Sequence, residues 1–132
     1  MNEFFIPDLA DLVEKYARHR PIEEEKYVTF SYGYVDLNDQ KEGLWISYFS
    51  NGNKKSEEHY HQGQLEGLSI LYNPFGTKSS EGYYHESKQE GLLIFYFLDG
   101  TKQLEGRNHQ NQREGLWIFY NEDGTKREEM YY

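Results

Sequence analysis

Hydrophobic and polar residues alternate along most of this chain, and the alternation repeats with a fixed period. The clearest copy is Glu-Gly-Leu-Trp-Ile-Phe-Tyr at 114–120, followed by a polar turn at 121–126. Related segments begin at Glu42, Glu66 and Glu90, which gives a period of 24 residues. A fixed period of this size indicates a repeat architecture in which each unit packs on its neighbours.

Each repeat contains two strand-like halves separated by a glycine turn. In the first repeat, 44–49 and 54–61 have the pattern of strands, and Asn51-Gly52 lies between them. Asn-Gly and Asp-Gly between apolar runs favour β-hairpins, because glycine readily adopts a positive φ. The sequence therefore predicts a mainly β fold, an antiparallel array of hairpin repeats with about nine strands in one twisted or curved meander sheet.

Three columns of like residues share one face of the first strand in each repeat. They are Leu44, Leu68, Leu92 and Leu116, then Ile46, Ile70, Ile94 and Ile118, then Tyr48, Tyr72, Tyr96 and Tyr120. Uniform, bulky apolar columns predict a packed interior. The other face varies between repeats and is partly aromatic, which suits a surface that contacts a partner. The alternative is that the curved sheet or a helix buries this face too.

The pairing of the two strands within a repeat has two solutions. A two-residue turn places Ile46 opposite Glu57, and a three-residue turn with a glycine bulge places it opposite Ser56. We favour the bulged form, because it moves the repeated acids to the face opposite the isoleucines, where a carboxylate remains solvated. These acids are Glu57, Glu81, Glu105 and Glu129.

The segment before the repeats predicts one α-helix over 8–20. Leu9, Leu12, Val13 and Tyr16 form an apolar stripe at helical spacing, and Pro21 ends it. We expect this helix to cover the open end or one face of the sheet; a partner-binding helix is the alternative. The predicted organisation is a single domain, 1–132, with a capping helix and linker at 1–25, a degenerate strand at 26–41 and four repeats at 42–132.

Net charge and composition narrow the classes of partner. The formal charge is −9, which disfavours nucleic acid and anionic lipid surfaces and favours a basic protein partner. The alternative is that the charge serves solubility alone. There is no cysteine, Met1–Ile6 has no cationic region of a signal peptide, and no apolar run approaches a membrane span. These features favour a cytoplasmic protein.

Two repeated patterns raise the question of chemistry. Equivalent glutamates lie two strands apart, roughly 9–10 Å, and share one environment, whereas a catalytic pair needs two different ones. His61, His85 and His109 form a column with the same spacing, which is too wide for neighbours in the column to bind one metal ion. We therefore expect structural acids near turns or beside lysines, no catalytic, cofactor-binding or metal-binding residues, and no enzyme activity.

The last repeat, 114–132, resembles the MORN repeat variant of bacterial proteins, and four such copies cover 42–132. Proteins built from this repeat are often antitoxin or immunity components beside a toxin, so the resemblance implies an immunity or antitoxin protein that binds a cognate toxin directly. The repeat also occurs in scaffolds for protein assembly and in relatives linked to membranes, which is the alternative. The sequence departs from the pattern at Ser87 and Asn111, which replace a turn glycine, and at Ser69 and Leu93, which replace tryptophan.

The variable face supplies the candidate partner-binding residues, together with two of the repeated acids. They are Trp45, Phe49, Phe95, Phe97, Trp117, Phe119, Glu105 and Glu129. Aromatic residues commonly dominate the binding energy of an interface, and acids complement a basic toxin. The last predicted strand, which ends at Tyr132, also offers an open edge to a copy of the chain or to a partner.

Overall fold

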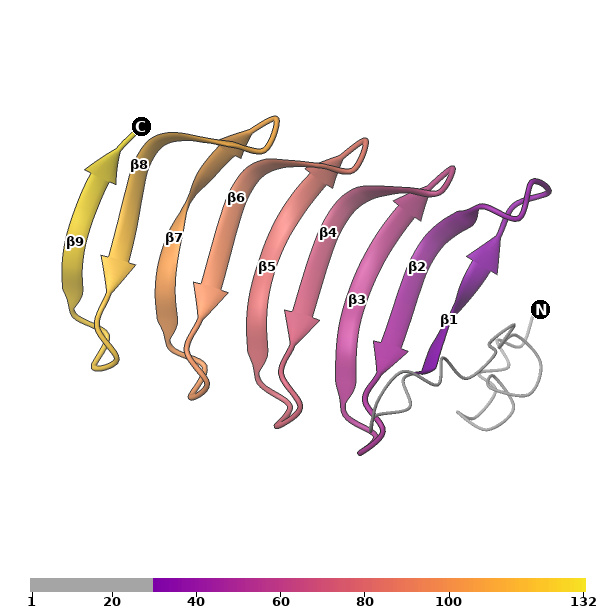
Figure 1. Cartoon of the computed structure of the whole chain (residues 1–132), viewed down its shortest axis with the longest axis horizontal. Helices are drawn as coiled ribbons and strands as arrows, with labels where there is room; N and C mark the ends of the chain where they lie inside the picture. Colours follow the sequence, from indigo (N-terminus) through magenta and orange to yellow (C-terminus); the bar gives the residue numbers. More distant parts are fainter. Residues whose placement is uncertain (1–29) are drawn as a thin grey trace, which may run out of the picture.

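The computed structural model describes residues 30–132, which form one antiparallel sheet of nine strands (Figure 1). Within this range the strands lie in chain order, so each strand pairs with its neighbours in the sequence. They are β1 (Phe30–Val35), β2 (Lys41–Tyr48), β3 (Lys54–His61), β4 (Gln64–Tyr72), β5 (Lys78–His85), β6 (Lys88–Tyr96), β7 (Lys102–His109), β8 (Gln112–Tyr120) and β9 (Lys126–Tyr131). The strands bow in the same direction and make a single curved layer.

The predicted meander of hairpin repeats is confirmed, and the fold class of the described chain is corrected from β with one α-helix to β alone. Residues 30–132 contain strands and turns and no helix. The range in which the helix was expected, 8–20, lies outside the described residues. β1 is the described part of the strand expected at the start of the array. The fold of the described chain is therefore all β.

The turn within each repeat is a three-residue loop closed by glycine. The Phe49 N–H donates to the Asn53 carbonyl at 2.8 Å, and the Gly52 N–H donates to the Phe49 carbonyl at 3.0 Å. Gly52 has a φ of +90°, which a residue with a Cβ adopts only with strain. The same bonds recur at the three later hairpins, which are closed by Gly76, Gly100 and Gly124.

The turn between repeats is a different one, with two central residues at positive φ. At the first such turn the values are 50° for Gln62 and 78° for Gly63. This geometry matches the right-handed twist of the flanking strands, which is why it is common in two-residue hairpins. Ser87 and Asn111 take the place of Gly63 at 63° and 66°. Loss of the glycine in these two repeats therefore leaves the turn type unchanged.

A second bulge follows each glycine loop and changes the strand register. Tyr48 pairs with Lys54, but Ser47 pairs with Ser56, so Lys55 has no directly opposite residue. An extra residue of this kind bends the strand and shifts the pairing by one position. The same shift occurs in the three later repeats.

The two bulges offset each other, so Ile46 lies opposite Glu57 and not opposite Ser56. The register favoured from the sequence is therefore wrong, although the loop itself has the expected bulged form. Ile70, Ile94 and Ile118 likewise pair with Glu81, Glu105 and Glu129. We call the face with the Leu, Ile and Tyr columns and these acids the tyrosine face. The opposite face, which carries Trp45 and Trp117, is the tryptophan face.

Each of three acids on the tyrosine face is bound by a lysine and a tyrosine. Glu105 accepts hydrogen bonds from Lys102 Nζ at 2.8 Å and from the Tyr120 hydroxyl at 2.5 Å. Partial burial acts to raise the pKa of Glu105, but these two hydrogen bonds outweigh it, and the pKa lies below its usual value. The hydrogen bond between Tyr120 and Glu105 raises the pKa of the Tyr120 hydroxyl to about 12.

This lysine–glutamate–tyrosine network repeats along the sheet and joins neighbouring hairpins. Glu57 is held by Lys54 and Tyr72, and Glu81 by Lys78 and Tyr96, while Glu129 is held by Lys126. A half-buried carboxylate without partners would destabilise the fold. The network therefore explains how the observed register accommodates an acid beside each isoleucine.

Within residues 30–132 no second layer covers the sheet, so a side chain is buried only by its neighbours on the same face. Ile94 exposes 7% of its surface and Trp117 exposes 1%. Leu44, by contrast, exposes 43%, and Leu92 and Leu116 each expose 38%. The prediction of a packed interior therefore holds at Ile94 and fails along most of the leucine column.

Replacing Tyr96 by phenylalanine should lower the free energy of unfolding by about 1 kcal/mol, because Glu81 loses its hydroxyl donor. The matched control is Tyr83→Phe on the same face, whose ring is 51% exposed. Chemical denaturation of both variants measures the difference. Equal stabilities of the two variants would contradict a stabilising role for the network.

Candidate partner-binding surfaces

Trp117 lies at the centre of a stacked cluster at the last hairpin. Its ring rests on Gly106 in β7, where a Cβ atom would lie 2.2 Å from the indole. The Arg113 guanidinium lies 4.6 Å from the centre of this ring and 5.2 Å from that of Tyr132. The indole N–H donates to the Arg107 carbonyl at 3.1 Å. The tryptophan is thus enclosed by a glycine, a cation and a second aromatic ring.

Trp45 lies in the same kind of cluster, three repeats earlier. Its ring rests on Gly33, where a Cβ would lie 2.5 Å from the indole, and the indole N–H donates to the Tyr34 carbonyl at 3.0 Å. Lys41 Nζ lies 4.8 Å from the centre of the Trp45 ring and 4.7 Å from that of Tyr60. Trp45 remains half-buried.

Both tryptophans therefore have a structural role that was not predicted. At 1% exposure, Trp117 could offer its ring to a partner only if Arg113 and Tyr132 moved away. A signal was present in the sequence: each tryptophan has a cation four residues before it and a tyrosine fifteen residues after it. The middle repeats have neither the tryptophan nor the cation.

The predicted phenylalanines lie on the tryptophan face. Phe95 is 38% exposed and Phe119 is half-buried, and both lie opposite Leu104 on the strand between them. Phe97 follows Phe95 by two residues, is half-buried and closes the next loop. We call Phe95, Phe97, Leu104 and Phe119 the phenylalanine patch. Phe49, also half-buried, occupies the equivalent of Phe97 two repeats earlier.

The two candidate acids lie on the other side of the sheet from this patch. The side chain of Glu105 is 21% exposed and that of Glu129 is 42% exposed, and each is paired with a lysine. The sequence predicts these acids on the face that points away from the isoleucines, which is the error in register described above. The predicted residues are therefore divided between two faces, and a partner on the phenylalanine patch would not contact these acids from the same side.

A second exposed apolar surface, which was not predicted, crosses the tyrosine face. Exposed fractions are 43% for Leu44, 51% for Tyr83, 38% for Leu92 and Leu116, and 77% for Tyr131. Leu116 lies directly opposite Tyr131, and Tyr83 lies opposite Leu68. We call Leu44, Leu68, Tyr83, Leu92, Leu116 and Tyr131 the leucine row. Periodicity alone could not find it, because a covered column and an uncovered column can have the same apolar pattern.

A glutamate and a histidine hold each inter-repeat turn in the array. Glu66 Oε1 lies 2.7 Å from His85 Nδ1, and its other oxygen accepts the Glu86 backbone N–H at 2.9 Å. Glu42 binds His61 and Gln62 in the same way, and Glu90 binds His109 and Gln110. The hydrogen bond to Glu66 raises the pKa of His85. The bond from the turn N–H lowers the pKa of Glu66. Glu42, Glu66 and Glu90 therefore hold the inter-repeat turns.

Within residues 30–132, no three His, Cys, Asp or Glu side chains come together in a way that could hold a metal ion. In the same range, no helix has the length and apolar character needed to cross a membrane. The histidines and acids form identical pairs in successive repeats, whereas general acid–base chemistry needs groups in distinct environments.

In a comparison with protein families, one family model matches two stretches of the chain. The sequence model of the MORN repeat variant matches residues 41–62 and 113–132. These two stretches are similar to the MORN repeat variant. No curated protein matched the chain in a further comparison. MORN repeats generally serve as scaffolds that bind proteins or membranes.

The two matched stretches are the repeats that keep tryptophan. The first spans β2 and β3 with Trp45, and the second spans β8 and β9 with Trp117. The two MORN-like repeats between them carry Ser69 and Leu93 at this place, yet they have the same strand register. The hairpin therefore persists without its tryptophan, because the turns and the lysine–glutamate–tyrosine network remain.

Replacing Trp117 by alanine should destabilise the protein by about 3–5 kcal/mol, because the substitution empties the most buried position of the sheet. The matched variant Trp45→Ala should cost less, since that ring is half-buried. Thermal and chemical unfolding would measure both. A Trp117→Ala variant as stable as the native chain would contradict the structural role.

Replacing Glu66 by glutamine should lower the pKa of His85 toward 6.5, because the paired carboxylate raises it. Since the folded-state pKa of His85 lies above the unfolded value, the pairing stabilises the fold fully below the unfolded pKa. That contribution is lost as the pH rises through the folded-state pKa. NMR titration of the His85 ring would measure the change, with Glu122→Gln in an exposed turn as the control.

Proposed function

We propose that this MORN-repeat protein is a non-catalytic binding protein that neutralises a basic toxin by direct contact, as an immunity or antitoxin protein. The MORN repeats support the general part of this proposal, a scaffold for binding. The toxin as partner is inferred from the resemblance to bacterial MORN-variant proteins and from the charge of −9. We further propose that the protein acts in the cytoplasm.

The exposed apolar side chains of the single-layer sheet are the observation that carries the proposal. The phenylalanine patch and the leucine row place large apolar groups on both faces, and Phe95, Leu92 and Leu116 each remain 38% exposed. A soluble monomer seldom exposes contiguous apolar surface without a binding role. A long sheet with two available faces suits contact with a protein surface of similar length.

The acidic charge supports a basic partner, although many of the acids are already paired. Those at the turns bind histidines, and those beside the isoleucines bind lysines. The charge therefore acts mainly through the overall field, which speeds the encounter with a positively charged protein. A toxin that cleaves nucleic acid fits this description, because it carries basic residues to bind phosphates.

The acidic net charge also favours protein binding over membrane docking. Anionic leaflets attract clusters of Lys and Arg, whereas the chain has 14 Lys and Arg against 23 Asp and Glu. Sedimentation with anionic vesicles tests this choice. Salt-sensitive binding to such vesicles would favour the scaffold that docks on membranes, and would count against a toxin partner.

The decisive experiment uses the protein encoded by the neighbouring gene. We expect it to be basic and toxic when expressed alone, and to be neutralised when this chain is expressed with it. Calorimetry of the purified pair should give a Kd well below micromolar, as direct neutralisation requires. A neighbour without toxicity, or without binding, would contradict the proposal.

Alanine variants of the phenylalanine patch should weaken that complex. Phe97→Ala and Phe119→Ala are each expected to cost about 2 kcal/mol of binding free energy, as central aromatic residues of an interface do. Both rings are half-buried, so unfolding curves must show that each variant remains folded. Phe75→Ala, at an 80% exposed turn position outside the patch, serves as the control. Equal affinities for all three variants would place the interface elsewhere.

A further inference from the structure

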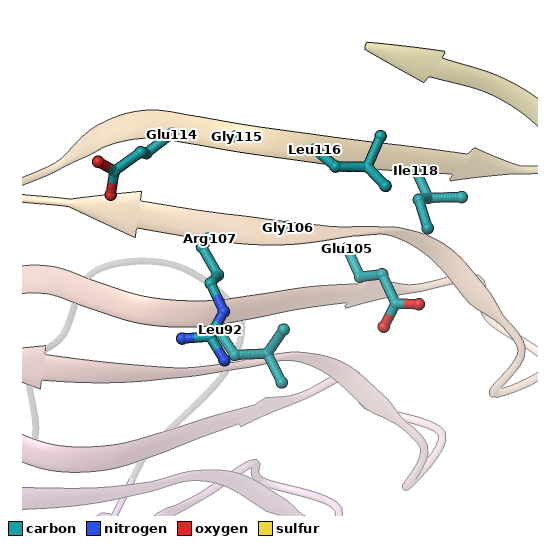
Figure 2. A pocket seen from close by; sticks show the side chains of 8 residues that line it. All are labelled: Leu92, Glu105, Gly106, Arg107, Glu114, Gly115, Leu116 and Ile118. Atoms are coloured by element: carbon teal, nitrogen blue, oxygen red, sulfur yellow. The ribbon is translucent and has the colours of Figure 1, made fainter. Parts of the chain in front are cut away.

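A groove crosses the tyrosine face between β6 and β8, over β7 (Figure 2). Its volume is about 440 Å³. The side chains that line it are Leu92, Glu105, Arg107, Glu114, Leu116 and Ile118. The backbone of Gly106 and Gly115 completes the lining.

The groove is a property of the repeat, because a smaller one lies one repeat earlier. Its volume is about 140 Å³, and its lining is Leu68, Glu81, Gly82, Tyr83, Leu92 and Ile94. Each of these residues precedes its counterpart in the larger groove by 24 positions. The main chemical difference is Arg107, which stands where the smaller groove has Tyr83.

The larger groove combines an aliphatic floor with two carboxylates. Leu92, Leu116 and Ile118 supply the apolar surface. Glu105 stays ionised at neutral pH, because hydrogen bonds from Lys102 and Tyr120 outweigh the effect of its partial burial and lower its pKa. The Glu114 carboxylate is exposed and accepts no hydrogen bond from residues 30–132, unlike Glu42, Glu66 and Glu90.

A long aliphatic side chain with a cationic head matches both parts of this lining. Arginine carries an apolar stem that packs on hydrophobic surface while its head stays with charged groups. Its planar guanidinium also forms paired hydrogen bonds with a carboxylate. We propose that the groove binds an arginine side chain of a basic protein, with the stem on Leu92 and Leu116 and the guanidinium at Glu114.

The spacing of the two grooves predicts the conformation of a partner segment that contacts both. Equivalent points lie two strands apart, which corresponds to roughly 10 Å. A polyproline II segment has three residues per turn and rises about 3.1 Å per residue, so every third side chain lies on the same side about 9 Å apart. Arginines at every third position of such a segment would therefore reach both grooves at once. That this segment belongs to a toxin rests on the proposed function; the chemistry of the groove does not.

Arg107 provides a sharp test, because it is the one cation in the lining of the larger groove. Its side chain runs from β7 toward Leu92 (Figure 2), and these two residues are paired across the strands. A second guanidinium in the groove would be repelled by it. The variant Arg107→Tyr copies the smaller groove and should therefore strengthen binding of a cationic probe.

The experiment is an NMR titration of the full chain, labelled at leucine and isoleucine methyl groups. The probe is the acetylated peptide Arg-Ser-Gly-Arg-Ser-Gly-Arg, and its control carries citrulline, a neutral analogue, in place of each arginine. We expect the arginine peptide to shift the methyl signals of Leu92, Leu116 and Ile118. The citrulline peptide should leave these signals unchanged.

Three variants complete the test. Glu114→Gln should weaken the arginine peptide about five-fold, and Arg107→Tyr should strengthen it about three-fold. Glu122→Gln makes the same charge change as Glu114→Gln in the last hairpin loop and should alter the Kd by less than about two-fold, as expected for a screened charge. The methyl spectra show whether each variant is folded.

The outcomes separate this inference from the proposed function. Equal binding of the citrulline peptide, or equal losses for Glu114→Gln and Glu122→Gln, would overturn the arginine groove. If the neighbouring protein binds but the arginine peptide does not, the groove assignment fails and the proposed function stands. If the peptide binds as expected and the neighbour does not, the groove stands and the toxin partner is wrong.

Discussion

The register of the hairpins is the constraint on which the other contacts depend. Because the glycine loop and the bulge at Lys55 offset each other, Glu57 faces the same side as Ile46. This places each repeated acid within reach of a lysine on its own strand and, in three repeats, of a tyrosine on the next hairpin. A shift by one residue would exchange the two faces and separate every such group from its partners.

Much of the architecture could be predicted from the sequence, because it depends on residues with strong local preferences. Glycines at the loops and the alternation of Leu, Ile and Tyr were sufficient for the strands, their order and the hairpin turns. The second bulge was not predictable, because Lys55, Ser79, Gln103 and Arg127 share no feature that marks a bulge. The error in the placement of Glu105 and Glu129 follows from the one extra residue in each of their strands.

The candidate surfaces were harder to predict than the strands, because exposure depends on what lies above a face. The same Leu column suits a covered interior and an open surface, and only the single-layer sheet distinguishes them. Trp117 was misjudged in the opposite sense: tryptophan is common at interfaces, yet here Gly106, Arg113 and Tyr132 enclose it. The phenylalanine patch and the leucine row consequently carry the case for binding.

The Glu66–His85 clamp and its equivalents join only strands that are adjacent, and the tyrosine bridges reach no farther than the next hairpin. In the described sheet, no contact of either kind links the first repeat with the last. The array therefore behaves as a linear lattice, in which the energy of a unit depends on its two neighbours. Deleting or duplicating one 24-residue unit would rejoin matching edges, so gene duplication can lengthen the binding surface stepwise without redesigning its chemistry.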